Sequence, residues 1–359
     1  MKRRILFCIC LVIMVYQKMQ SQHNKWIVIT TIQKPTPALK KIAQKCPEWQ
    51  LLVVGDEKTP DDWHLDDHCI YLSPSDQKKL PYSLCKLLPF NHYARKNIGY
   101  LYAIAHGAQI IYETDDDNYI IDTIKIFRNN DNIALLSSKN FVINVYHYFG
   151  QEKAWPRGYP LAHIKNSDNY YIEPFKNNGK IIIEQGLVDK DPDLDALFRL
   201  TYHQELFFNE AQRPCVLADN IFSPFNTQNT LFHYEAFYGL YIPAYVPFRT
   251  CDIWRGYITQ RLMQETGHKI CFTPPTAIQE RNVHNYMQDF EEEIDLYLKS
   301  HLLLQLLNDW KAPGKNILDN MKDLYSYLIQ NNFFEKQEEP LISAWIDDIT
   351  CALAAQNAI

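Results

Sequence analysis

The sequence predicts an α/β protein in which helices flank a mostly parallel sheet. Short apolar runs rich in β-branched residues alternate with segments whose apolar residues recur at helical spacing, a pattern typical of parallel sheets. Polar residues stand at the ends of several of these runs. With 359 residues, of which 47% are hydrophobic, the chain is long enough to bury a large core.

The predicted elements follow one another from the N-terminal side. Residues 26–32 form a β-branched strand, and residues 37–46 can form the helix that follows it. Residues 51–54 predict a second strand and residues 69–72 a weaker third one. In residues 92–105 the apolar side chains recur every three or four positions, which predicts the next helix.

The strand after this helix, residues 110–118, carries three adjacent carboxylates near its end, which we call the acidic triplet: Asp115, Asp116 and Asp117. Clustered like charges repel one another, and a divalent cation such as Mg²⁺ or Mn²⁺ relieves the repulsion. These cations take hard oxygen ligands and usually bring substrate phosphates with them. The alternative interpretation is a solvated, Asp-rich turn.

Other polar residues end the neighbouring strands. Thr30 and Thr31 close the first strand, and Asp56 follows the second. Ligands of open parallel sheets bind beyond the carboxyl ends of the strands. We therefore expect these three side chains to face one crevice together with the acidic triplet.

Positive charge is expected beside this crevice, because Arg95 and Lys96 stand in the first turn of the helix at 92–105. Cations at a helix N-terminus are unfavourable unless an anion offsets them, although a solvated surface is the alternative. The turn at 31–35 is not Gly-rich, which argues against Walker-type NTPases, dinucleotide-binding proteins and nucleotidyltransferases with a Gly-rich loop. A net charge of -6 gives no basic footprint for nucleic acid.

Several ordered blocks between about residues 25 and 290 carry a family resemblance: residues 27–36, 53–60, 93–100, 112–118, 191–201, 224–230 and 249–256. In these blocks the chain resembles the STELLO family of Golgi proteins, which in turn resembles glycosyltransferases of the GT-A fold. The resemblance implies a GT-A-like (Rossmann-like) fold that binds a nucleotide-diphospho-sugar, expected to be UDP-linked, together with Mn²⁺ or Mg²⁺.

The resemblance also implies roles for the acidic triplet. It occupies the place of the metal-binding DXD motif, with Asp115 and Asp117 as metal ligands and Asp115 and Asp116 as donor contacts. A third metal ligand in this fold is often a downstream histidine. The sequence does not rank His163, His203, His233, His268 and His284 for this role.

By the same likeness Thr30, Thr31 and Asp56 would face the nucleoside, and Arg95 the diphosphate. Glycosyl transfer with inversion needs a base that takes the proton of the acceptor hydroxyl. Asp252 is the residue we expect in this catalytic role. It precedes a predicted helix at 253–265, so an N-cap is the alternative interpretation.

Two further segments have both a structural and a functional interpretation. Asp191, Asp193 and Asp195 precede an apolar stretch, where they either begin a helix or contact an acceptor. Trp155 stands in a segment rich in Pro and Gly, residues 155–160, which predicts an exposed loop. An exposed ring there could contact a sugar, whereas most aromatic residues fill cores.

The N-terminal residues indicate the compartment. Basic residues precede the apolar run at 5–16, which predicts that residues 1–22 are a signal-anchor or signal peptide. We expect a GT-A-like domain at 23–285 and a helical C-terminal extension at 286–359. The expected location is a Golgi or other secretory-pathway membrane, as a single-pass type II protein with a lumenal domain; a secreted protein is the alternative.

The sequence thus favours a metal-dependent glycosyltransferase that transfers a hexosyl or pentosyl group from a nucleotide sugar to a glycan or protein acceptor. Its expected partners are these substrates, the membrane and a complex with other glycosyltransferases, but not nucleic acid. A non-catalytic relative that binds glycans or organises other glycosyltransferases is the second interpretation. A metal-dependent hydrolase or nucleotidyltransferase is the third.

Overall fold

A computed structural model describes residues 23–128, 132–165, 170–176, 179–202, 204–280, 285–314 and 316–357. The predicted signal-anchor at 1–22 lies outside these residues. The strands are β1 (Lys25–Thr31), β2 (Gln50–Gly55), β3 (Ile70–Leu72), β4 (Ile110–Thr114), β5 (Asn118–Ile120), β6 (Ala134–Ser138), β7 (Tyr170–Pro174), β8 (Ile181–Lys190), β9 (Cys215–Leu217), β10 (Asn229–His233) and β11 (Lys269–Gln279).

The helices flank these strands. The α-helices are α2 (Pro37–Lys45), α3 (Pro74–Gln77), α4 (Leu84–Leu87), α5 (Lys96–Ala105), α6 (Val145–Tyr148), α7 (Ala196–Thr201), α8 (Cys251–Gln264), α9 (Tyr286–Glu292), α10 (Ile294–Asp309), α11 (Ile317–Gln330) and α12 (Glu338–Asn357). The 3₁₀ helices are η1 (Tyr93–Arg95), η2 (Leu161–His163), η3 (Tyr234–Leu240) and η4 (Phe248–Thr250).

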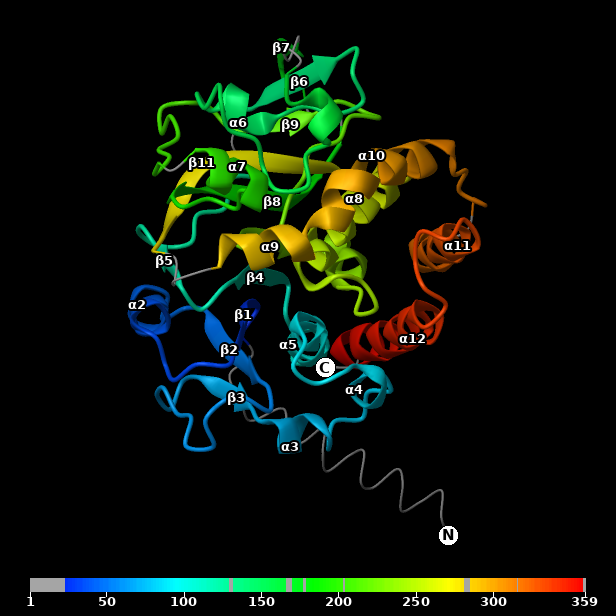
Figure 1. Cartoon of the computed structure of the whole chain (residues 1–359). Coiled ribbons are helices and arrows are strands. Elements are labelled where there is room, and N and C mark those ends of the chain that lie inside the picture. Colours follow the sequence, from blue (N-terminus) through cyan, green and yellow to red (C-terminus); the bar gives the residue numbers. More distant parts are fainter. Residues whose placement is uncertain are drawn as a thin grey trace.

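The strands of the described residues form one large sheet in the order β3-β2-β1-β4-β10-β8-β11-β9-β6-β7, with β5 paired to β11 (Figure 1). The pairs β1–β2, β1–β4 and β2–β3 are parallel. Beyond β4, antiparallel pairs join parallel ones, since β10 runs antiparallel to both β4 and β8. The predicted α/β architecture with flanking helices is confirmed and is consistent with a GT-A-like fold.

The parallel region forms for local reasons. The β-branched residues of β1 and β2 are buried on both faces, as strands covered by helices require. The side chain of Thr36 caps α2, whose first residue is Pro37. A Cβ atom at Gly99 would lie 2.7 Å from side-chain atoms of Val28 and Val54. The glycine therefore lets α5 lie close to β1 and β2 and brings its N-terminus to the sheet edge.

The C-terminal helices return to the parallel region. In Figure 1, α10, α11 and α12 descend from α8 to α4 and α5, and α12 contacts both of the latter helices. The carboxylate of Asp348 in α12 accepts hydrogen bonds from the backbone N–H groups of Ser83 and Leu84 at the start of α4 (3.0 and 2.8 Å). Helices far apart in the sequence thus share one hydrophobic core.

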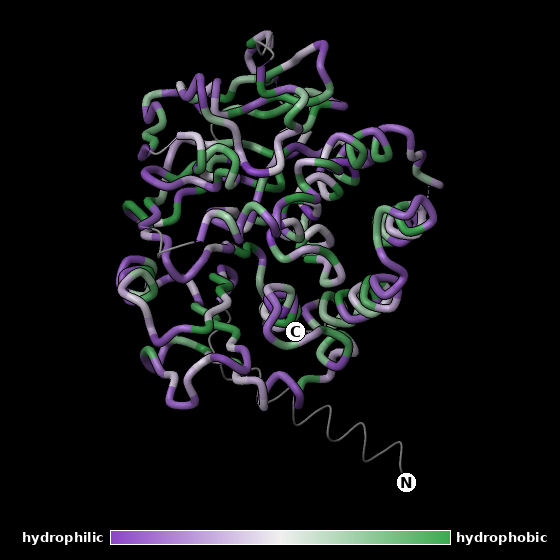
Figure 2. Tube along the Cα trace, in the orientation of Figure 1, coloured by the Kyte–Doolittle hydropathy of each residue, from purple (hydrophilic) through white to green (hydrophobic). Residues whose placement is uncertain are grey.

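Hydrophobic and hydrophilic positions alternate along the C-terminal helices (Figure 2). This alternation is typical of helices that cover a core on one side and face water on the other. Within the described part of the chain, no helix combines the length and the apolar character needed to span a membrane.

Candidate functional site

A cavity of about 450 Å³ opens where β1, β2 and β4 end, a volume in the range of small-molecule sites. The residues predicted for donor, metal and base all line this one cavity: Thr30, Thr31, Asp56, Arg95, Asp115, Asp116, Asp117 and Asp252. Further lining comes from α8, from the segment before it and from β11. The structure thus brings the predicted residues together, while their roles toward a ligand stay predictions.

Asp115 begins the turn between β4 and β5 and is the most constrained acid of the triplet. The hydroxyl of Tyr93 donates a hydrogen bond to Asp115 Oδ1 over 2.7 Å. The ammonium group of Lys96, whose side chain is fully buried, lies 3.7 Å from the same oxygen. Burial raises the pKa of Asp115 to about 7; the Lys96 charge opposes this shift, and Asp117 adds to it.

The other two acids of the triplet hold neighbouring segments. Thr31 donates its hydroxyl proton to Asp116, while Thr36 donates to the Asp116 backbone carbonyl. Burial raises the pKa of Asp116, although the Thr31 hydrogen bond opposes the shift. Asp117 Oδ2 accepts from the Gln279 amide over 3.1 Å. A partly buried turn replaces the solvated turn that was the alternative interpretation.

These acids suit a divalent cation by their donor chemistry. In the described residues no three His, Cys, Asp or Glu side chains converge on a common point for a metal. Mg²⁺, however, is usually held by one or two carboxylates and completes its shell with substrate phosphates and water. Asp115 and Asp117 fit this pattern. His163, His233 and His268 do not line the cavity, and His203 and His284 lie outside the described residues.

The carboxylate of Asp56 accepts hydrogen bonds from the backbone. Its carboxylate accepts from the N–H groups of Glu57, Asn91 and His92, over 2.7, 2.7 and 3.1 Å. A buried carboxylate with such partners fixes the course of the chain. Asp56 therefore joins the end of β2 to the segment that enters η1, and its predicted nucleoside contact stays a prediction.

Arg95 is also engaged within the protein. Its guanidinium donates to Gln77 Oε1 and to the backbone carbonyls of Cys85 and Leu88, and it lies 4.1 Å from the ring centre of Phe90. The alternative of a solvated surface is wrong, because Arg95 is 1% exposed. These hydrogen bonds tie Arg95 to the segment around α3 and α4.

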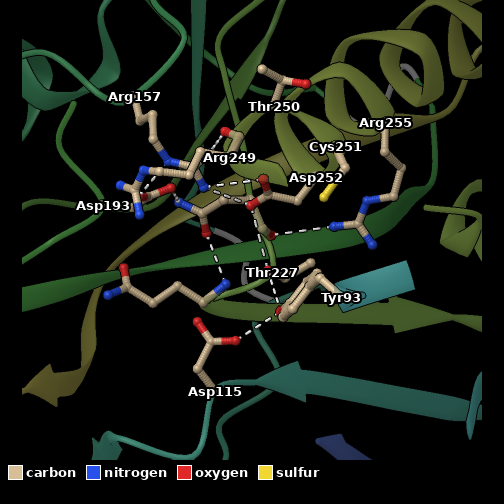
Figure 3. Close-up of polar contacts among 12 residues, drawn as sticks. Tyr93, Asp115, Arg157, Asp193, Thr227, Arg249, Thr250, Cys251, Asp252 and Arg255 are labelled. Carbon is tan, nitrogen blue, oxygen red and sulfur yellow. Dashed lines mark hydrogen bonds and ion pairs between the residues drawn. The ribbon is translucent and has the colours of Figure 1, made fainter. Parts of the chain in front are cut away.

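Asp252 lies in the first turn of α8, one residue after the helix begins. The N-cap alternative is wrong, because Thr250 occupies the cap position. Both oxygens of Asp252 accept from Arg157 Nη2, at 3.1 and 2.9 Å. Arg157 also donates through Nε to Asp193 Oδ1 over 2.7 Å, so Figure 3 shows the arginine between two carboxylates.

Sequence reasoning missed Arg157, although it stands in the Pro- and Gly-rich segment that was singled out. The segment is not an exposed loop, since Trp155 is only 7% exposed and donates to Asp195 Oδ2 over 2.6 Å. Its glycine allows a close approach, because a Cβ at Gly158 would lie 2.3 Å from Ile253 of α8. The predicted exposure of Trp155 is therefore wrong, and the segment packs against α8.

The three downstream aspartates have separate roles. Asp195 caps α7 through the backbone N–H of Phe198 (2.8 Å), which confirms the helix-entry interpretation for this residue. Asp193 lines the cavity beside Arg157, and Asp191 pairs with Arg199. One local pattern thus contains a helix cap, a cavity residue and a largely buried ion pair.

A buried ion pair connects the two sides of the cavity. Glu113, the penultimate residue of β4, accepts from both terminal nitrogens of Arg255 in α8, over 2.9 and 2.6 Å. Tyr100 of α5 also donates to Glu113. Since Glu113 stands two residues before Asp115 and Arg255 three residues after Asp252, the pair fixes the strand end relative to α8.

Comparisons with known proteins identify the family of the chain. A family model described as STELLO glycosyltransferases matches residues 249–355. "Probable glycosyltransferase STELLO1" of Arabidopsis thaliana is 34% identical over 91% of the chain, and "Probable glycosyltransferase STELLO2" of the same plant is 32% identical over 91%. The chain belongs to the STELLO family.

The chain spans 44% of the length of each of these two STELLO relatives. The part matched by the STELLO model begins at Arg249, whose backbone carbonyl accepts from Arg157 beside the cavity. It continues through α8 and into α12. The matched region therefore includes the Asp252 side of the cavity together with the C-terminal helices.

Proposed function

We propose that the chain is a metal-dependent glycosyltransferase that uses a nucleotide-diphospho-sugar, with UDP as the nucleotide. The observation that carries the proposal is that all the predicted site residues line one cavity, at the ends of β1, β2 and β4 and at the starts of α5 and α8. Membership of a family described as glycosyltransferases supports the transfer reaction. The acceptor in this proposal is a glycan or protein hydroxyl.

The charge of the cavity supports the metal requirement. Its lining contains six aspartates and four Lys or Arg residues, so the formal excess is two negative charges. A diphosphate would be repelled by this excess unless a cation accompanied it. We propose that Asp115 and Asp117 hold Mg²⁺ or Mn²⁺, and that Asp116 contacts the donor. A bound cation would supply charge stabilisation for the departing diphosphate.

The residues that line the cavity would then have separate roles in binding and in proton transfer. Thr30 and Thr31 line the cavity at the end of β1, where the nucleoside would lie. Asp252 would accept the proton of the acceptor hydroxyl, and Arg157 fixes its orientation. Because the guanidinium of Arg95 donates to groups within the protein, Arg95 would contribute to the shape and the electrostatic field of the cavity wall.

Calorimetry of UDP binding to the full chain, with Mn²⁺ and with EDTA, tests the proposal. We expect Mn²⁺-dependent binding that the double variant Asp115→Asn/Asp117→Asn weakens at least a hundredfold, since it removes both anionic ligands. Asp122→Asn is the matched control, because Asp122 is an exposed neighbour of the triplet that does not line the cavity. Absence of binding for UDP, GDP and CMP under both conditions would contradict the proposal.

We also propose a secretory-pathway location with the domain in the lumen, where nucleotide sugars are supplied. The support is the predicted segment at 1–22 and the membership of the STELLO family. Protection of the chain from protease in sealed microsomes, lost after detergent is added, is the expected result. Digestion in intact microsomes would contradict the lumenal orientation.

A further inference from the structure

Tyr93 lines the cavity and makes polar contacts with residues of several elements (Figure 3). Besides its bond to Asp115 Oδ1 at 2.7 Å, its hydroxyl lies 2.6 Å from Thr227 Oγ1 and 2.9 Å from Lys96 Nζ. Thr227 Oγ1 in turn lies 3.4 Å from Asp252 Oδ2. A series of polar contacts therefore runs from the acidic triplet to the first turn of α8.

The number of protons fixes the direction of these bonds. A tyrosine hydroxyl has one proton to donate and two lone pairs that accept. Lys96 can only donate, and an ionised Asp115 can only accept. With Asp115 ionised, as a bound cation requires, the Tyr93 proton goes to Asp115, while the Tyr93 oxygen accepts from Lys96 and from Thr227. All three hydrogen-bonding positions of the hydroxyl are then filled.

This arrangement determines which hydrogen-bond donors Asp252 has. Thr227 also has a single proton, and when Tyr93 accepts it, none is left for Asp252. The charge of Asp252 is then balanced through Arg157, which lies 2.9 Å from Oδ2. The Oδ2 oxygen, in a residue that lines the cavity, then keeps a lone pair that no proton of Thr227 occupies. Asp252 would use this lone pair to accept the proton of an acceptor hydroxyl.

We propose that Tyr93 is a positioning residue that couples the cation side of the cavity to the carboxylate of Asp252. It orients Asp115 by donating to it, and it keeps the Thr227 proton away from Asp252. The proposal rests on the proposed function and deepens it, because it assigns positioning roles to two further residues that line the cavity, Tyr93 and Thr227.

Tyr93→Phe removes the hydroxyl and keeps the ring, which packs edge-on to Phe248 with the ring centres 6.1 Å apart. Asp115 loses its donor, and the Thr227 proton becomes available to Asp252. Since hydrogen bonds to charged groups are worth more than neutral ones, we expect roughly tenfold weaker UDP binding in Mn²⁺. Binding in EDTA should not change, because Asp115 acts on the cation.

Thr227→Val removes the hydroxyl that contacts both Tyr93 and Asp252. We expect a loss of about threefold in UDP affinity with Mn²⁺, because Tyr93 keeps its bond to Asp115 but loses a donor that holds it in place. In the double variant Tyr93→Phe/Thr227→Val, the loss should equal that of Tyr93→Phe alone. Such non-additivity is the signature of two residues that act through one chain of contacts.

Tyr257→Phe is the matched control. Tyr257 is a buried tyrosine that donates to the backbone carbonyl of Gly158 over 3.0 Å and does not line the cavity. We expect this variant and Tyr93→Phe to lose similar thermal stability, and only Tyr93→Phe to lose Mn²⁺-dependent UDP affinity. A merely structural role of Tyr93 would instead lower UDP affinity equally in Mn²⁺ and in EDTA.

The experiment is calorimetry of UDP on the full chain in Mn²⁺ and in EDTA, with electron paramagnetic resonance of Mn²⁺ alone as a second readout. Wild-type affinity in Tyr93→Phe, or additive losses in the double variant, would overturn the coupling and leave the proposed function intact. Absence of UDP binding in the wild type would overturn both. If Tyr93→Phe does not fold, Thr227→Val and Asp115→Asn/Thr227→Val form the cycle, with non-additivity again expected.

Discussion

The end of β4 and the N-terminus of α12 both shield a carboxylate from water, partly at Asp115 and fully at Glu338, but the partners of these two carboxylates differ. Glu338 in α12 accepts from the Tyr241 hydroxyl and from the backbone N–H groups of Ala244 and Tyr245, the latter two at 3.2 and 2.9 Å. Asp115 has one hydroxyl donor, a lysine at 3.7 Å and two further acids beside it.

The difference teaches how to separate a structural acid from a binding acid in this fold. A buried carboxylate with several backbone donors is satisfied by the chain and fixes two segments to each other. Clustered carboxylates that line an open cavity repel one another, which is tolerable where a ligand relieves the repulsion. The first kind should control stability, and the second kind should control binding.

The largest effect on stability is expected at Glu338. Glu338→Ala leaves three donors without their acceptor, at about 1 kcal/mol each, so the free energy of unfolding should fall by about 3 kcal/mol. UDP affinity of the folded variant should not change, because Glu338 does not line the cavity. Chemical denaturation and calorimetry on the same sample test both parts. A loss of UDP affinity with unchanged stability would break the comparison.

If Asp115 is a binding acid, UDP affinity in Mn²⁺ should depend on pH. The pKa of Asp115 lies at about 7, so its carboxylate becomes protonated as the pH falls through this value and no longer serves a cation. UDP affinity in Mn²⁺ should fall about tenfold between pH 8 and pH 6, a difference near 1.4 kcal/mol. Affinity in EDTA is the control. A profile that is flat in Mn²⁺ would contradict this role.

Removal of the Asp115 charge should have a smaller effect of opposite sign on stability. The folded-state pKa of Asp115, about 7, is raised above the unfolded value, so ionisation of Asp115 opposes folding; this penalty grows as the pH rises from the unfolded pKa to about 7 and is constant above that. Asp115→Asn should therefore raise the free energy of unfolding by about 1 kcal/mol at pH 8 and leave it unchanged near pH 4. Denaturation at both pH values measures this. Destabilisation at pH 8 would place Asp115 with the structural acids.

The smallest effect is expected at Asp348, which holds the N-terminus of α4. Asp348→Asn keeps the shape of the side chain and one acceptor oxygen, so the free energy of unfolding should fall by about 0.5 to 1 kcal/mol. Asp347→Asn, on the same helix, is the control and should be neutral. Equal losses in the two variants would show that the cap contributes nothing specific.

Local patterns predicted the first part of the fold. Periodicity and β-branching within residues 26–118 gave β1, α2, β2, β3, α5 and β4 with small shifts at their ends. The acidic triplet was predictable for the same reason, because an apolar run next to charges is visible in a few residues. Side chains that meet at the ends of neighbouring parallel strands follow from that alternation.

The remaining features depend on contacts between distant residues. Arg157 binds Asp252, which lies 95 positions later in the sequence, and no local pattern predicts this pairing. The direction of Arg95 depends on where α3 and α4 place the Gln77 amide and two carbonyl groups. Burial of Trp155 depends on an acceptor forty positions later, Asp195. Composition made that segment resemble an exposed loop, and only the fold reveals that α8 covers it.

The most direct test of the account is diffraction from crystals of the full chain grown with UDP and Mn²⁺, with anomalous scattering to locate the metal. We expect Mn²⁺ within coordination distance of Asp115 and Asp117, at roughly 2.0 to 2.3 Å from their oxygens, and the diphosphate of UDP bound to the same ion. UDP bound outside the cavity, or Mn²⁺ held by other residues, would contradict the account.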